Sequence, residues 1–385
     1  MFFKGLSGTV SCKYLTLQIR DVEKKNMNSF KRKCVFSCLF IAFYCAVGAV
    51  SAQDASEKTS QRQSDTAEGF TLEQLKSLAG KKGFKPYAGN PVLSPGKKGV
   101  WDAGALGSMT VVKVNGVYHL YYEAWGIPSG KVKGWMGWFS TLQIGHATSN
   151  DGLHWKKDAA NPVIAKDKNT WEVTGTWDPF VIYEEGRFKM WYGGGHHPCD
   201  WAYAVSKDGT HFIKKGRISY LGAVEDDHVI HDAEKNLYHM YYIDREIKRW
   251  GGLLRATSHN ETEFDFGAAQ GLKIYGEQYP ARYKFTHVFV DNGMLYMLYG
   301  RPSRKADEGT IRLATSSDGV HWRSVNKNLL VGIDGEIIKA DKNLYLIYYG
   351  PQGYYDKKNC DIRVALYKGE LKHLVAENAP PSPDQ

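Results

Sequence analysis

The sequence lacks the local signatures of several large enzyme classes. It contains no glycine-rich phosphate loop, no Gly-x-Ser-x-Gly nucleophile turn and no His-Glu-x-x-His helix. Helical periodicity is also nearly absent, and only "TLEQLKSLAG" at 71–80 has the pattern of a helix. These absences argue against nucleotide-binding phosphate-loop proteins, α/β-hydrolases and helix-based zinc proteases, and they favour an all-β fold.

Cysteine is scarce beyond the first fifty residues, where four of the six cysteines lie. Only Cys199 and Cys360 remain, and they could form one disulfide bond, although the sequence does not give their separation. The loop at 193–201 gathers two histidines, Cys199 and Asp200, but adjacent histidines do not supply the usual spacing of zinc ligands. We therefore assign no metal ligands from local spacing.

Long apolar runs are limited to one, from Cys34 to Val50. It follows the basic residues 31–33 and precedes small residues that end at Ala52, which is the pattern of a secretory signal peptide. We expect residues 1–52 to be an N-terminal extension and signal, with Met27 as a candidate start and cleavage near Ala52. The mature protein would be secreted or periplasmic without a stable membrane span, and a retained anchor is the alternative.

The net charge of the chain is also small once residues 1–52 are set aside. The formal net charge of +9 falls to about +3 for the remainder, because residues 1–52 hold eight basic and two acidic residues. We expect no nucleic-acid partner. Residues 53–69 are polar and read as a flexible linker, which leaves 70–385 as the catalytic domain. The sequence leaves the oligomeric state open.

Aromatic residues are abundant, at 13% of the chain with 24 Tyr and 11 Trp. They suit β-strands, and their rings can also stack on the faces of sugars. A repeat orders them: "ATSNDGLHW" at 147–155 recurs at 204–212, 256–264 and 314–322, with a degenerate copy at 364–371. A second unit, an apolar strand followed by a Tyr-rich strand, runs in phase with the first.

The spacing of these units predicts the fold. Their starts lie 50 to 58 residues apart, and each period supplies about four short antiparallel strands. "NPVI" at 161–164 is read as a fourth strand, and Asn90-Pro91-Val92-Leu93 is read as the same element before the first full unit. We predict an all-β, five-bladed β-propeller of four-stranded antiparallel blades. A β-sandwich would not account for two units in phase.

The innermost strands of a propeller run alike along its axis, so the residues that precede them meet at one mouth. Aligning the five predicted inner strands on Asp178 places a first row of residues together: Ser108, Asp178, Asp226, Phe285 and Asp334. Two residues later comes a second row: Thr110, Phe180, His228, His287 and Glu336. The preceding loops hold Asp102 and Glu172 at equivalent places.

Several carboxylates in one funnel repel each other, and such an arrangement is more typical of functional sites than of scaffolds. Two opposed carboxylates with aromatic neighbours are the groups that glycoside hydrolysis uses. A single Asp could instead cap its own loop by binding backbone amides. The histidines could orient a carboxylate, bind a sugar hydroxyl, hold a metal or act as the acid. The aromatic residues of 134–140, with Trp125, could form a sugar platform or a lid.

The chain resembles the superfamily of five-bladed propeller glycosidases, which includes glycoside hydrolase families 32, 43, 62, 68, 117 and 130. The resemblance lies in "WDPFVIYEEGRFKMWYGG", in the "ATSNDGLHW" repeats and in "AVEDDHVIHDAEKNLYHMYYID", and it covers roughly 88–371. It implies an axial pocket with a base or nucleophile, a pKa-tuning Asp and an acid on successive blades. The first of these slots holds Ser108 here, which puts the role of the first blade in doubt.

From the residues and this resemblance, the sequence favours a secreted, exo-acting glycoside hydrolase. Asp178 is the expected base or nucleophile and Asp226 its tuning partner, while the acid is contested between Glu336 and Glu225, with His287 third. Asp102 is an alternative base. The expected substrate contacts are Trp125, Trp177, His228, His287 and Asp334.

Two alternatives remain open at this point. Ser108 in the first-blade slot favours a propeller that binds glycans without cleaving them. Glu225-Asp226 is similar to the acidic pair of the mannoside phosphorylases of family 130, but Asp227-His228 follows where Pro-Arg is typical. No cofactor is required for hydrolysis, and a structural divalent cation in the central channel is conceivable.

Overall fold

A computed structural model describes residues 69–127, 139–195, 200–220, 224–244, 252–276, 286–301, 309–351 and 360–376. The side chains of 219, 220, 224–227, 286, 301 and 326 are outside this description. The predicted signal, nearly all of the predicted linker, Cys199, Phe285 and most of the aromatic loop at 134–140 also lie outside the described residues. No helix within the described ranges combines the length and apolar character needed to cross a membrane.

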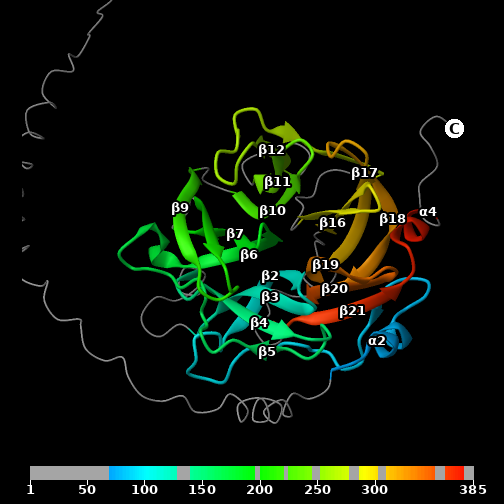
Figure 1. The fold of residues 1–385 in the computed structure, drawn as a ribbon, viewed down its shortest axis with the longest axis horizontal. Coiled ribbons are helices and arrows are strands. Elements are labelled where there is room, and N and C mark those ends of the chain that lie inside the picture. The colour runs from blue at the N-terminus through cyan, green and yellow to red at the C-terminus, as the bar shows by residue number, and fades with distance from the viewer. Residues whose placement is uncertain are drawn as a thin grey trace, which may run out of the picture. The chain divides into compact units, whose positions relative to one another are not determined.

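Five sheets surround one axis (Figure 1), and their inner strands β2, β6, β10, β15 and β19 contact one another in sequence, with β19 returning to β2. The predicted five-bladed propeller is therefore confirmed. The first blade is β2 (Ala105–Val114), β3 (Val117–Trp125), β4 (Gln143–Ser149) and β5 (Lys156–Lys157). The second blade is β6 (Thr176–Glu184), β7 (Arg187–Gly194), β8 (Asp200–Ser206) and β9 (Ile213–Tyr220).

The remaining blades follow the same order from the axis outward. The third is β10 (Val224–Asp232), β11 (Leu237–Asp244), β12 (Leu253–Ser258) and β13 (Gln270–Gly271). The fourth is β15 (Thr286–Asp291), β16 (Met294–Arg301), β17 (Thr310–Ser316) and β18 (His321–Val331), with β14 (Lys273–Tyr275) added in parallel to β18. The fifth is β19 (Ile333–Asp341), β20 (Leu344–Gly350), β21 (Arg363–Lys368) and β1 (Lys85–Pro86).

The fifth blade combines strands from the N-terminal and C-terminal ends of the domain, because β1 is its outer strand. β1 pairs antiparallel with β21, and Figure 1 shows red β21 beside the blue N-terminal segment. Leu93 then bridges to Ile362, as Ile164 bridges to Ile144 in the first blade. Asn90 and Asn161 are equivalent as predicted, since each amide side chain bonds both backbone groups of one residue in the adjacent strand.

One detail of the strand prediction is wrong. Residues 161–164 are not the fourth strand of the first blade, because that strand is the two-residue β5, and Ile164 adds only an isolated bridge. Asn161 explains the difference: its side chain takes the place of a strand backbone by bonding the N–H and C=O of His146. The corresponding Asn90 segment belongs to the fifth blade rather than to the first.

The repeated turns are locally determined. In the first, Asp151 Oδ1 accepts the backbone N–H groups of Leu153 and His154 at 2.8 and 2.9 Å, and Ser149 Oγ accepts the N–H of Gly152 at 2.8 Å. Asp208 and Asp318 make the same bonds in the second and fourth blades. These acids cap their own loops by accepting backbone N–H groups.

The turns also join neighbouring blades, which explains the Tyr-rich second strands. Tyr348 of β20 donates to the carbonyl of Gly152 at 2.8 Å, and Tyr121 of β3 donates to that of Gly209 at 2.9 Å. Gly152 has φ +77° and a Cβ there would lie 2.6 Å from the Tyr348 hydroxyl, so glycine is needed on both counts. Aromatic and aliphatic clusters between adjacent blades complete the core.

Helices lie outside the ring of blades. The predicted helix at 71–80 is confirmed as α2 (Leu72–Leu78), and Thr71 and Gln74 form a capping box at its start. The structure adds α4 (Leu371–Ala376) after β21 and a short 3₁₀ helix at Trp171–Thr174. None of these elements contributes a side chain to the axis, so the candidate site is formed by strands.

Candidate functional site at the propeller axis

The second row predicted from the sequence forms one layer of side chains around the axis. We call this layer the floor ring; its members, one from each blade, are Thr110, Phe180, His228, His287 and Glu336. Thr110 donates to Glu336 at 3.3 Å, the rings of His228 and His287 stack at 4.7 Å, and Phe180 lies 4.5 Å from the His228 ring. All five inner strands therefore meet in a single contact network.

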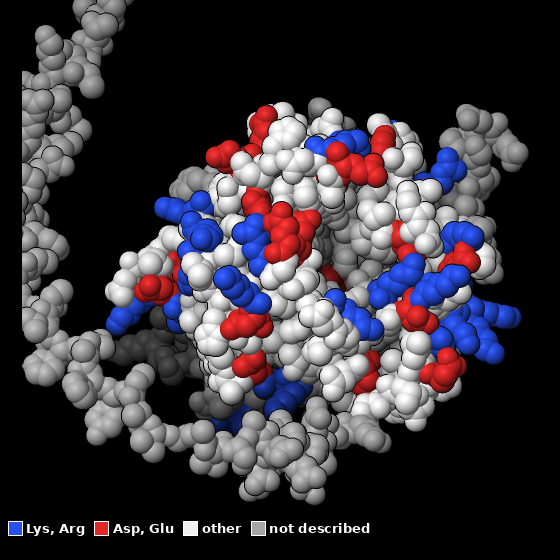
Figure 2. Space-filling view, in the orientation of Figure 1, with Lys and Arg blue, Asp and Glu red and all other residues white. Residues whose placement is uncertain are grey.

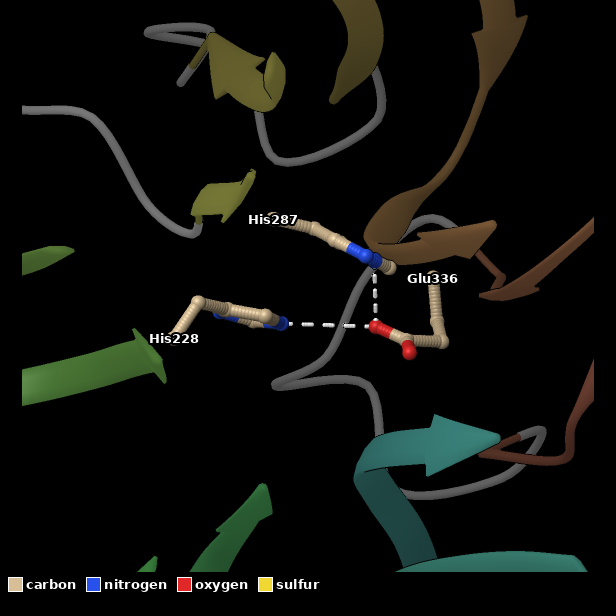
Figure 3. A group of neighbouring side chains, drawn as sticks. All are labelled: His228, His287 and Glu336. Atoms are coloured by element: carbon tan, nitrogen blue, oxygen red, sulfur yellow. Dashed lines mark hydrogen bonds and ion pairs between the residues drawn. The ribbon is translucent and has the colours of Figure 1, made fainter. Parts of the chain in front are cut away.

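Glu336 is the centre of the floor ring. Its Oε1 accepts the Thr110 hydroxyl and the Val111 backbone N–H, both at 3.3 Å. Its Oε2 lies 3.3 Å from His228 Nε2 and 2.5 Å from His287 Nδ1 (Figure 3). Burial acts to raise the pKa of Glu336, but His287 and His228 outweigh it and hold the pKa well below its ordinary value. The carboxyl group is consequently ionised near neutral pH.

The two histidines face the same carboxylate oxygen from different blades (Figure 3). Burial lowers the pKa of His228 to about 4, despite the opposing hydrogen bond that its Nε2 donates to Glu336, so its ring is neutral near pH 7. His228 Nδ1 is buried and has no hydrogen-bond partner within the described part of the chain. His287 Nδ1 also lies 3.2 Å from the backbone N–H of Ile337, which donates to it.

A bulge precedes the floor ring on four of the inner strands. Its residue pairs are Gly107-Ser108, Asp178-Pro179, Asp226-Asp227 and Asp334-Gly335. Asp178 and Asp334 have φ of 44° and 51°, a left-handed conformation that Asp tolerates better than most residues. Both are half-buried, in contrast to the buried Glu336 two residues after Asp334. The bulges therefore place acidic residues at the entrance to the ring.

The centre of the propeller is hollowed on the face shown in Figure 2, and acidic side chains lie around and within the hollow. Figures 1 and 2 share one orientation, so this hollow coincides with the axis around which the inner strands lie.

Sequence reasoning missed Glu123 of β3. This residue is buried, and its Oε2 accepts the backbone N–H of Asp178 at 3.1 Å. It lies opposite the Gly107-Ser108 bulge, so the small residues of the first inner strand let a carboxylate from the second strand cross to the next blade. No local signal marks Glu123, since it lies in a Tyr-rich second strand like those of the other blades.

The acidic residues of the preceding loops are equivalent, as predicted, but each is paired within its own blade. Asp102 is buried and forms an ion pair with Lys157 at 2.5 Å. Glu172 pairs with Lys214 and accepts the Tyr192 hydroxyl at 2.6 Å. The contacts of Asp102 in the described residues do not include the floor ring, so Asp102 as an alternative base remains a prediction.

The other predicted site residues lie in two settings. Trp125 and Trp177 pack in a buried cluster with Leu142 and Cys360, with side chains 9% and 4% exposed, so neither is an open sugar platform. Glu225 and Asp226 lie in β10 at the bulge, and their side chains fall outside the description. His228, His287 and Glu336 come together as the sequence predicted, and Asp178 and Asp334 occupy equivalent bulges.

Comparison with known proteins finds similarity in part of the sequence and in the fold. No protein-family model matches the chain. The uncharacterized protein Rv1502 of Mycobacterium tuberculosis is 26% identical over 225 residues, 54% of this chain and 71% of that protein. A 1,2-β-oligomannan phosphorylase of Thermoanaerobacter sp. is 28% identical over 112 residues, which is 29% of this chain and 36% of that enzyme.

Solved structures share the fold over most of the chain. The β-1,2-mannobiose phosphorylase from Listeria innocua, in complex with β-1,2-mannobiose, has a TM-score of 0.62 at 14% identity and covers 77% of this chain and 99% of that one. A thermostable family-43 glycoside hydrolase has a TM-score of 0.51 at 17% identity and covers 71% and 91%. At these identities the likeness is one of fold.

Proposed function

We propose, from the five-bladed propeller fold that this chain shares with glycoside hydrolases of families 43 and 130, that it is a glycoside hydrolase acting in the axial hollow. One observation carries the proposal: all five inner strands meet in a polar, buried floor ring, with acidic bulge residues directly before it. A binding scaffold does not need a set of ionisable groups that converge in this way.

Asp178 is the proposed base or nucleophile. Its backbone N–H is held by the buried Glu123, and its left-handed φ of 44° fixes the direction in which the carboxylate leaves the strand. Glu123 thus acts as a positioning residue that supports Asp178 from the first blade. This arrangement compensates for Ser108, which occupies the slot where a first-blade Asp would be expected.

The proton donor is assigned to the acidic pair of the third blade rather than to the floor ring. A general acid has to be protonated when the reaction begins, but the pKa of Glu336 is held low and its oxygens are committed to four partners. We therefore propose Glu225 as the acid and Asp226 as the residue that tunes it. Glu336 then holds the histidines in place beneath the sugar.

The buried floor ring supports the proposal of exo-action. Thr110, His287 and Glu336 are at most 5% exposed, so a glycan that enters the hollow ends at this layer. We propose that the enzyme releases sugar from a chain end, and that the N-terminal segment directs it to the periplasm or outside the cell. Cell fractionation with an antibody against the domain tests the second statement.

Phosphorolysis is a second candidate, because two of the similar proteins are phosphorylases of β-1,2-linked mannosides. Such a reaction needs a cationic site for phosphate, whereas the floor ring contains no Lys or Arg and His228 is neutral at pH 7. The geometry consequently favours water as the acceptor.

The experiment offers purified protein a panel of oligosaccharides, including β-1,2-mannobiose and mannan fragments, with and without inorganic phosphate. We expect free sugar in both conditions and a loss of about 100- to 10,000-fold in kcat for Asp178→Asn, as for removal of an acid–base group. Asp208→Asn, which changes an exposed turn acid, is the control and retains activity.

The outcomes separate the alternatives. Sugar phosphate that forms only with added phosphate establishes a phosphorylase. Binding without turnover on every substrate establishes a glycan-binding propeller. Hydrolysis that survives Asp178→Asn but not Asp102→Asn moves the base to the preceding loop.

A further inference from the structure

Glu336 differs from four other buried carboxylates of the described residues in the nature of its partners. Asp102 pairs with Lys157, Glu172 with Lys214, Asp200 with Arg217 and Asp291 with Lys339. Within the described ranges Glu336 has no Lys or Arg partner, and two imidazole rings take that place. A buried carboxylate without a cation is costly, so a positive charge is expected at this point.

The geometry points to a metal ion as that charge. We propose that His228, His287 and Glu336 bind a divalent transition-metal ion at the propeller axis, with Zn²⁺ the best match. Their ligating atoms, one from each residue and each from a different blade, lie within 4.8 Å of one another. Two imidazole nitrogens and one carboxylate oxygen are a donor set of catalytic zinc sites, which leave a further position open.

The two carboxylate oxygens of Glu336 have different partners, which is the arrangement expected of a metal ligand. Oε1 is fixed by the Thr110 hydroxyl and the Val111 N–H, which leaves Oε2 directed at both histidines. Hydrogen bonds that orient a ligating carboxylate are a regular feature of metal sites. Thr110 and Val111 therefore serve as supporting groups from the first blade.

The contact between His287 and Glu336 gives a second, independent argument. Ile337 also directs its N–H at His287 Nδ1, so this nitrogen is held between Ile337 and Glu336. Nδ1 and Oε2 lie 2.5 Å apart, and a metal ion shared between them would take the place of the proton that such a contact otherwise needs. With metal–ligand bonds of about 2.0–2.2 Å, tetrahedral ligands lie about 3.3 Å apart, so the pair needs to open by less than about 1 Å.

The chemistry of the donors also predicts selectivity. Ca²⁺ and Mg²⁺ prefer sets of six or more oxygen ligands, whereas imidazole nitrogens favour Zn²⁺ and its neighbours. The fourth position would be filled by water or by a sugar hydroxyl from the hollow. Metal binding itself does not depend on the proposed hydrolase activity.

The test uses the tag-free full chain, stripped with a chelator and titrated with Zn²⁺, Mn²⁺ and Ca²⁺ by calorimetry. We expect about one Zn²⁺ per chain and weaker binding of Ca²⁺. Glu336→Gln and His287→Gln should each weaken Zn²⁺ binding by at least about tenfold, the loss seen even for outer partners of metal ligands. The matched control is His321→Gln, which breaks an exposed histidine–carboxylate pair and should leave binding unchanged.

A crystal of the wild-type protein soaked in Zn²⁺ provides a readout that does not depend on the folding of variants. An anomalous peak at the zinc edge among the three ligating atoms supports the site. The proposal is overturned if the peak lies elsewhere or is absent, if Ca²⁺ binds more tightly than Zn²⁺, or if folded Glu336→Gln binds Zn²⁺ as well as wild type does. None of these results bears on whether sugar is released.

Discussion

Histidine–carboxylate pairs occur in two regions of this propeller, the outer turns and the floor ring. In the turns, His154, His211 and His321 contact an Asp three residues earlier at 2.7–2.8 Å, and all three imidazoles are exposed. In the floor ring, His228 and His287 contact Glu336 from separate blades; His287 and Glu336 are buried, and the side chain of His228 is 12% exposed. In the turns, a histidine–carboxylate pair thus forms between residues close in sequence. In the floor ring, it forms only after the blades have come together.

The difference teaches how to separate scaffold from site in a repeat protein. A turn pair occurs at the same position in several repeats and its Asp is already satisfied by its own backbone, as Asp318 shows. A ring pair varies between repeats and its partners come from elsewhere. Variation at a structurally equivalent position is therefore the better guide to function.

The largest expected effect comes from breaking the floor ring. Glu336→Ala removes the shared partner of His228, His287 and Thr110, and we expect the free energy of unfolding to fall by about 3–5 kcal/mol, as for a buried pair that loses one member. Urea unfolding followed by tryptophan fluorescence measures it. A loss below about 1 kcal/mol would mean that Glu336 is no more important than a turn carboxylate.

A smaller loss of stability is expected in the fifth blade, where the N-terminal segment that contains Asn90 pairs with β21. Asn90→Ala removes two hydrogen bonds to the backbone of Val364 and should cost about 2 kcal/mol. Asn161→Ala is a matched control, because it removes the same two bonds to His146 within a blade that is continuous in sequence. If Asn90→Ala costs no more than Asn161→Ala, closure adds nothing beyond the two bonds.

A third prediction concerns His119, in the second strand of the first blade. His119 of β3 stacks on His146 and packs against Phe188, and burial, together with His146, lowers the pKa of His119 to about 4. Because the unfolded state binds a proton below about pH 6.5 and the folded state does so only near pH 4, stability falls as pH drops through this window.

The size of this pH effect is on the order of 1 kcal/mol, since His119 is only half-buried and solvent screens part of the shift. Urea unfolding at pH 7 and pH 4.5 measures it, and His119→Gln should flatten the difference. An unchanged pH dependence in the variant would assign the effect to other groups, with the neighbouring His146 the first to test.

The smallest effect is expected in the turns. Asp318→Asn keeps an acceptor for the N–H groups of Val320 and His321 and loses only an exposed ion pair, so we expect a change below about 1 kcal/mol. Thermal unfolding at neutral pH measures it. A cost comparable to that of Glu336→Ala would remove the distinction between the two regions.

Much of the fold could be predicted because its signals are local. The "ATSNDGLHW" repeat encodes a turn whose Ser, Asp and Gly bond one another, so it marks each blade whatever surrounds it. β1 could not be predicted, since a two-residue strand carries no pattern and owes its position to a partner almost three hundred residues later.

The candidate site was predictable in part for a similar reason. The alignment of inner strands correctly brought His228, His287 and Glu336 into one layer, because equivalent strand positions face the axis at equal depth. It missed Glu123, which reaches the site across a bulge from a second strand. It also proposed Trp125 and Trp177 as sugar contacts, and the structure shows both largely enclosed by apolar packing.

The dependence of the last blade on β1 has a consequence for synthesis. A ribosome releases residues 85–86 long before it makes residues 363–368, so this strand waits without its partner while four blades emerge. Until β21 is made, β1 has no partner and the fifth blade lacks its two outer strands. This chain would need a chaperone for longer than a protein whose repeats are each complete when translated.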